Sequence, residues 1–160
     1  MAPTDAAWES FRAAPVDPIT RHYWQISIDI VRNNVTRYTT VCDRVLDVGC
    51  GAGVRTVGFA RCGRRCVGID PSETAIEAAR RAAAAASVEV QFRVAAAEDL
   101  PFDSRTFDAV VMASVLQHVD DQRLALNEAR RVLKPGGVLI VAVRFPQLAS
   151  NLLVVGKVLP

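Results

Sequence analysis

A short apolar run that ends in a cluster of glycines is the feature that most constrains this chain. Residues 44–48 (RVLDV) are followed by Gly49, Gly51 and Gly53. Glycine reaches backbone conformations that other residues avoid, and it loses more conformational freedom on folding. Three glycines at alternate positions therefore indicate a tight turn, or a backbone that something must approach closely. The run itself predicts a buried strand that leads into this turn.

Strand and helix patterns alternate along the rest of the sequence. We predict further strands over 66–69, 88–92, 107–112 and 138–143, and helices over 19–38, 54–61, from 72 or 74 to 86, and 120–133. Gly63 is expected to end the second helix. Ser72, or a capping box of Thr74 with Glu77, is expected to begin the third, and Asp120 to begin the fourth. Such alternation predicts an α/β fold with a doubly wound, mostly parallel, Rossmann-like sheet.

Composition narrows the classes of partner. Apolar residues make up 51% and charged residues 22% of the 160 residues, as in ordinary globular domains. The net charge is +2 and no basic run exceeds a pair, so we expect no nucleic-acid partner. No stretch approaches the length of roughly 20 apolar residues that a membrane helix requires. The N-terminus lacks the apolar segment of a signal peptide.

The cysteines occur at positions 42, 50, 62 and 66, and none forms a C-x-x-C pair. Both histidines lie far from them in the sequence, so we expect no metal site. Without a secretion signal the thiols are expected to stay reduced, in a cytoplasmic protein.

The position of the glycine turn indicates what it binds, since such sheets bind ligands beyond the carboxyl ends of their strands. Its spacing is G-x-G-x-G, and Val54 stands where a dinucleotide motif has its third glycine. No Gly-Lys pair follows, as a P-loop would require. Asp70 ends the next strand, where a carboxylate can accept both ribose hydroxyls. The pattern predicts a nucleoside pocket without a phosphate requirement and disfavours a nicotinamide-dependent oxidoreductase.

Five segments in order and spacing resemble the class I S-adenosylmethionine-dependent methyltransferases, and within them the small-molecule group of the ubiquinone/menaquinone-biosynthesis type. These segments are VLDVGCGAG (45–53), VGIDPS (67–72), AEDLPF (97–102), FDAVVMASVLQHV (107–119) and RVLKPGGVLIV (131–141). The resemblance spans roughly residues 44–143, and it implies S-adenosylmethionine as the cofactor.

The resemblance assigns the methionine part of the cofactor to the first glycine turn. Gly49, Cys50 and Gly51 would pass beneath it, mostly through backbone groups. Asp47 would hold its ammonium group directly or through water, or would instead only stabilise the turn. Ala113 would offer its carbonyl to the same ammonium group. Cys50 is expected to fill space, not to act as a nucleophile, because no histidine is near it in sequence.

The nucleoside part is assigned to the next two segments. Asp70 would bind the ribose, or would only cap the helix after Pro71, which would itself pack on the adenine. Ala97 would offer its N–H to the adenine ring. Glu98 would lie nearby, or would be a solvated loop residue. Many family members carry Asp or Asn where this chain has Ala96, so one hydrogen bond of about 0.5–1.5 kcal/mol is absent or supplied otherwise.

Catalysis by such an enzyme depends mainly on positioning, because the sulfonium leaving group is already activated. A base is needed only where the acceptor is a hydroxyl, an acidic carbon or a protonated amine. His118 is the candidate catalytic base, with an unperturbed pKa of about 6.5. The alternatives are that His118 packs as a structural histidine and that Gln117 orients the substrate. His22, Tyr23 and Trp24 either cover the cofactor site or pack against the sheet.

The tail is shorter than the resemblance implies, because the family fold continues past the fifth strand with a helix and two more strands. We therefore expect the usual C-terminal strands to be missing from one methyltransferase domain over 1–160. Within it, 1–40 would be an arm and a helix, 41–143 the cofactor-binding core and 144–160 a tail. An uncovered apolar strand at a sheet edge is prone to association. Either the tail folds over this edge, or a second copy covers it in a homodimer.

Two hypotheses of function stay open from the sequence. The first is methyl transfer from S-adenosylmethionine to a small-molecule acceptor through an O, N or C nucleophile. The alternative is a non-catalytic S-adenosylmethionine-binding module or partner subunit, which a shortened chain would favour.

Overall fold

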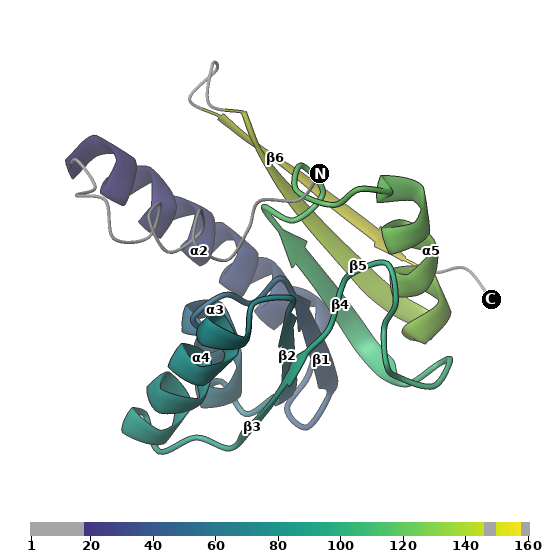
Figure 1. Ribbon diagram of the computed structural model, residues 1–160, viewed down its shortest axis with the longest axis horizontal. Helices are drawn as coiled ribbons and strands as arrows, with labels where there is room; N and C mark the ends of the chain where they lie inside the picture. Colours follow the sequence, from purple (N-terminus) through teal and green to yellow (C-terminus); the bar gives the residue numbers. More distant parts are fainter. Residues whose placement is uncertain (1–17, 146–149, 158–160) are drawn as a thin grey trace.

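A computed structural model describes residues 18–145 and 150–157 of the chain. The elements in chain order are α2 (Pro18–Tyr38), β1 (Arg44–Val48), α3 (Val54–Arg61), β2 (Arg65–Asp70), α4 (Glu73–Ala85), β3 (Val90–Val94), β4 (Phe107–Ala113), α5 (Gln122–Val132), β5 (Leu133–Phe145) and β6 (Ser150–Lys157). The strands form one sheet in the order β3-β2-β1-β4-β5-β6 (Figure 1). Strands β1 to β5 pair in parallel, and β6 pairs antiparallel with β5. The predicted doubly wound, mostly parallel α/β sheet is confirmed.

The alternation of side chains along β1 gives the sheet two buried faces. Leu46 and Val48 pack in the core that includes Ala129 of α5. Val45 packs in the opposite core, which includes Phe59 of α3 and the C-terminal half of α2. Because successive strand residues point to opposite faces, Asp47 lies on the α3 side. This placement matters for the site described below.

The ends of the helices confirm some of the expected caps and correct others. Gly63 follows the end of α3 with a φ of 82°, as a C-terminal glycine should. At α4 the Ser72 hydroxyl accepts a hydrogen bond from Ala75 N at 3.2 Å, so the Thr74–Glu77 capping box is wrong. At α5 the cap is Asp121, not Asp120 as predicted, because Asp121 holds the extended conformation and accepts from Leu124 N.

The strands also differ from the prediction at their ends. β3 begins at Val90, since Val88 N donates to Ala83 O and closes the end of α4 instead. β5 begins at Leu133, five residues before the predicted start, and its pairing with β4 is irregular over residues 134–137.

The edge of β5 is covered by the tail, as one of the two alternatives predicted. The pairing runs from Val138 opposite Lys157 to Phe145 opposite Ser150. The homodimer that was the other alternative stays a prediction. Of the helices in the part of the chain that the structure describes, none has the length and hydropathy needed to cross a bilayer.

Candidate ligand-binding site

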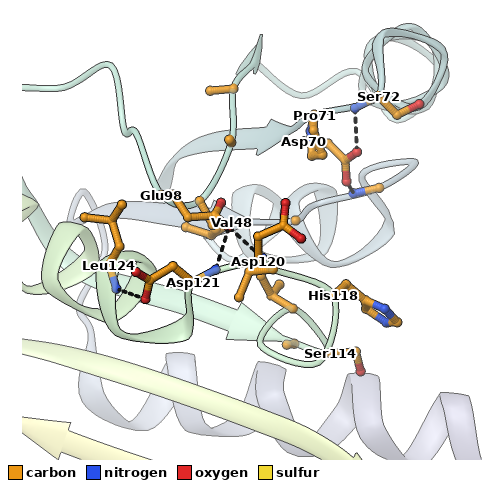
Figure 2. A pocket seen from close by; sticks show the side chains of 18 of the residues that line it. Val48, Asp70, Pro71, Ser72, Glu98, Ser114, His118, Asp120, Asp121 and Leu124 are labelled. Atoms are coloured by element: carbon orange, nitrogen blue, oxygen red, sulfur yellow. Dashed lines mark hydrogen bonds between the residues drawn. The ribbon is translucent and has the colours of Figure 1, made fainter. Parts of the chain in front are cut away.

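A cavity of about 780 Å³ opens beyond the carboxyl ends of the central strands (Figure 2). Of the predicted cofactor-binding residues, all except Asp47 and Cys50 line it, namely Gly49, Gly51, Asp70, Pro71, Ala97, Glu98 and Ala113, and so does the candidate base His118. The topology therefore brings together residues that the sequence spreads over 70 positions. Within residues 18–145 and 150–157, no group of His, Cys, Asp or Glu side chains is arranged to hold a metal ion.

The glycine turn after β1 leaves bare backbone beside this cavity. Gly49 has a φ of 66°, and a Cβ there would come within 2.6 Å of the Val115 side chain. Gly51 has a φ of 54°, but a Cβ there would meet nothing within 4 Å, because it would point into open space. Packing against Val115 thus requires a glycine at position 49. At position 51 a side chain would fit the protein but would occupy the open space beside the backbone.

Asp70, at the end of β2, joins this turn to the next one. Its Oδ2 accepts a hydrogen bond from Gly51 N at 2.9 Å, and its Oδ1 accepts from Ser72 N at 3.0 Å. The N-cap of α4 is Ser72, so the alternative in which Asp70 caps this helix is wrong. A carboxylate offers about four lone-pair positions, so two protein donors leave it with capacity to accept further hydrogen bonds from a ligand in the cavity.

Asp47 lies behind the turn and is completely buried. The Thr56 hydroxyl donates to its Oδ2 at 2.7 Å, while its Oδ1 faces Arg55 Nε at 3.9 Å, an ion pair too long for a hydrogen bond. Burial raises the pKa of Asp47, and the Arg55 charge and the Thr56 hydrogen bond oppose that rise. Asp47 therefore does not line the cavity itself, whereas Arg55, its ion-pair partner, does.

Arg55 is a site residue that the sequence analysis missed. Its Nη2 donates to Gly49 O at 3.2 Å and to Ala113 O at 3.3 Å, and the residue lines the cavity. It is the second residue of α3, and its only sequence signal is a charged residue close behind the glycine turn. The guanidinium thus links the ends of β1 and β4.

The loop over 97–102 is fixed by α5. Leu100 N donates to Glu128 Oε2 at 2.9 Å, and Arg131 donates to Leu100 O and Phe102 O at 2.9 and 2.7 Å. Glu98 Oε1 accepts from the backbone of Asp120 at 3.0 Å, so Glu98 is not simply a solvated loop residue. Figure 2 draws this bond beside the one from Asp121 N to the same Glu98 oxygen.

Cys50 has a packing role. Its side chain is buried in the core cluster that contains Ile76 and Phe92. Burial raises the pKa of the Cys50 thiol far above its ordinary value, so the reactive thiolate is disfavoured. These observations favour the expected role of Cys50 as a space-filling residue and not as a nucleophile.

His118 lies on the loop between β4 and α5, with a solvent-accessible side chain at the cavity rim. Its backbone N–H donates to Val115 O at 2.8 Å. Partial burial lowers the pKa of His118 below its ordinary value of 6.5, which favours the neutral imidazole. Nearby Ser114, also unpredicted, lines the cavity with a φ of 60°. His22, Tyr23 and Trp24 fall on α2, where their side chains lie outside the described residues.

The fold and cavity together define a Rossmann-like nucleoside-binding domain. The carboxylate at the end of β2 and the bare turn after β1 suit a ribose and the chain attached to it. Comparison with known proteins names the group more closely. Residues 46–141 match the methyltransferase domain family, and the chain belongs to it.

Known relatives agree with this assignment. The chain is 41% identical over 99 residues to a ubiquinone biosynthesis O-methyltransferase of Mesorhizobium japonicum. That alignment covers 62% of this chain and 40% of the relative, so the chain spans about two fifths of the length of the curated relatives it matches.

Solved structures share the fold. The YcgJ protein from Bacillus subtilis is 29% identical with a TM-score of 0.71, over 78% of this chain and 54% of that one. A SAM-dependent methyltransferase from Methanosarcina mazei is 33% identical with a TM-score of 0.64, over 68% of this chain and 56% of that one.

Proposed function

We propose that this chain transfers the methyl group of S-adenosylmethionine to the hydroxyl of a small-molecule acceptor. The observation that carries the proposal is the Asp70 carboxylate, held by Gly51 N at the edge of a cavity in a chain of the methyltransferase domain family. The name of the relatives, which are O-methyltransferases, supports a hydroxyl acceptor.

The cavity residues suit the parts of the cofactor. Asp70 would accept hydrogen bonds from the ribose hydroxyls, and Pro71 and Ala97, which line the same cavity, would hold the adenine. Gly51 leaves room for the methionine part of the cofactor, since a side chain there would project into open space. Ala113 also lines the cavity, and its carbonyl accepts a hydrogen bond from Arg55.

The chemistry asked of the protein is modest. When bound, the cofactor supplies a methyl group on a cationic sulfur, which leaves readily. The apolar side chains of Val115, Val119 and Leu124 line the cavity and would exclude water around an apolar acceptor. His118 at the rim takes the proton from the acceptor hydroxyl, and its lowered pKa keeps it in the proton-accepting form.

The same proposal includes a cytoplasmic setting with reduced thiols. It is supported by the cysteines, all four of which are free in the described part of the chain.

Calorimetry and a methyl-transfer assay test the function. S-Adenosylmethionine, its product S-adenosylhomocysteine and NAD are titrated into the protein, and transfer is then measured on a panel of phenols, quinols and amines. Binding of the first two with transfer to a phenol or quinol supports the proposal. Binding without transfer to any acceptor favours the non-catalytic module, and no binding at millimolar concentrations overturns both.

A further inference from the structure

Arg55 places a cation where the family resemblance assigns the methionine part of the cofactor. Its Nη2 holds the carbonyl oxygens of Gly49 and Ala113. Its Nε and the Asp47 Oδ1 that faces it at 3.9 Å are both buried, and neither has a hydrogen-bond partner. The pair is therefore incompletely satisfied.

The acceptors that Arg55 holds are those that an ammonium group would need. The Ala113 carbonyl and Asp47 are the groups assigned to the cofactor ammonium, and Gly49 O lies beside them. Two cations that share these acceptors in a poorly solvated place repel each other. A ligand ammonium must therefore displace the guanidinium or forgo these contacts.

We propose that Arg55 occupies the ammonium position, so that an ammonium group on the 5′ substituent of a bound adenosine derivative contributes little to its affinity. This inference rests on the proposed function. In this site the nucleoside part supplies most of the affinity, and the ammonium group of S-adenosylmethionine adds little.

The surroundings of Arg55 explain why it stays in place. Asp47 is fully buried, and Arg55 is the cation paired with it. Removing the partner of a buried charge is strongly unfavourable, so moving the guanidinium toward the solvent has a cost. The side chain is 20% exposed and borders the cavity.

The unaltered protein provides the first test. Calorimetry compares S-adenosylhomocysteine with its desamino analogue, which keeps the carboxylate and lacks the ammonium group. We expect the analogue to bind at least as tightly, because Arg55 already holds the acceptors. Weaker binding of the analogue would overturn the inference.

Variants provide the second test. It compares S-adenosylhomocysteine with 5′-methylthioadenosine, which lacks both the ammonium and the carboxylate of the amino-acid portion. Arg55→Met frees the Gly49 and Ala113 carbonyl oxygens, which can then accept hydrogen bonds from the ammonium. We expect the preference for S-adenosylhomocysteine over 5′-methylthioadenosine to rise about tenfold, equivalent to about 1.4 kcal/mol. An unchanged or smaller preference overturns the inference, and a smaller one identifies Arg55 as a carboxylate ligand instead.

The control is Arg61→Met, which makes the same change at an exposed position of the same helix and should leave the preference unaltered. Circular dichroism checks folding, and Arg55→Gln replaces Arg55→Met if the latter does not fold. Failure of the proposed function is distinguishable, because then neither nucleoside binds and both proposals fall. If both nucleosides bind and the preference does not rise, this inference alone fails.

Discussion

The Asp70 carboxylate accepts a hydrogen bond at 2.9 Å from the backbone N–H of Gly51, nineteen residues earlier in the chain. This bond joins the end of β2 to the turn after β1, so the two strands present one surface to a ligand. The same carboxylate also orders the start of α4 through Ser72 N. The proposed ligand contact and the local structure therefore depend on the same side chain.

Replacing this carboxylate should weaken nucleoside binding. Asp70→Asn keeps the shape but removes the charge, and hydrogen bonds to charged groups are worth about 1.5–3 kcal/mol. We expect the Kd for S-adenosylhomocysteine to rise at least tenfold in calorimetry. Glu89→Gln, an exposed change near the opposite end of β3, serves as the control. Equal affinity in the two variants would remove Asp70 from the site.

The two glycines of the turn should respond differently to alanine. Gly49→Ala would force a Cβ against Val115 at 2.6 Å and should lower the unfolding temperature markedly. Gly51→Ala meets no neighbour, so it should cost only about 1 kcal/mol of backbone strain while reducing ligand affinity. Thermal unfolding and calorimetry on both variants measure these effects. A stable Gly49→Ala protein would contradict the packing argument.

His118 should affect turnover and not cofactor binding. We expect His118→Gln to lower kcat by roughly a hundredfold or more, a typical contribution of a general base, with the Kd for S-adenosylhomocysteine unchanged. Because burial lowers the pKa of His118, wild-type activity should be lost only as the pH falls below 6.5, through that lowered pKa. The activity of His118→Gln should not show this loss at acidic pH. Identical pH profiles would exclude His118 as the base.

The Glu128–Arg131 pair should make part of the stability depend on pH. The hydrogen bond from Arg131 holds the pKa of Glu128 below its ordinary value of 4.5. Its stabilising contribution is then complete above pH 4.5 and is lost as the pH falls through the lowered value. Urea unfolding across this range should show a stability difference between wild type and Glu128→Gln that shrinks in acid. A constant difference would argue against this linkage.

A substitution at the other end of this pair tests how the loop over 97–102 is held. Arg131→Met removes the hydrogen bonds to Leu100 O and Phe102 O. At about 1 kcal/mol each, their loss should destabilise the protein by roughly 2 kcal/mol and also weaken nucleoside binding. Arg130→Met, an exposed neighbour on α5, is the matched control.

The errors at element ends have a common cause. Asp120 and Asp121 are equally good caps by sequence, and only the bond from Asp120 N to Glu98 and the extended backbone of Asp121 decide between them. Likewise, Val88 continues the alternation of a strand, yet its N–H closes α4. Local patterns identify an element, whereas contacts from distant segments select its last residue.

The sequence by itself determined the α/β class, the glycine turn and the Asp70 carboxylate. These follow from local periodicity and from backbone conformations that few residues other than glycine adopt. Only the tertiary structure decided that Asp47 is sealed behind the turn, that Arg55 holds Gly49 and Ala113, and that β6 covers β5. The direction in which the second residue of a helix points depends on how that helix docks on the sheet. Docking is a property of the assembled core, which no short stretch of sequence contains.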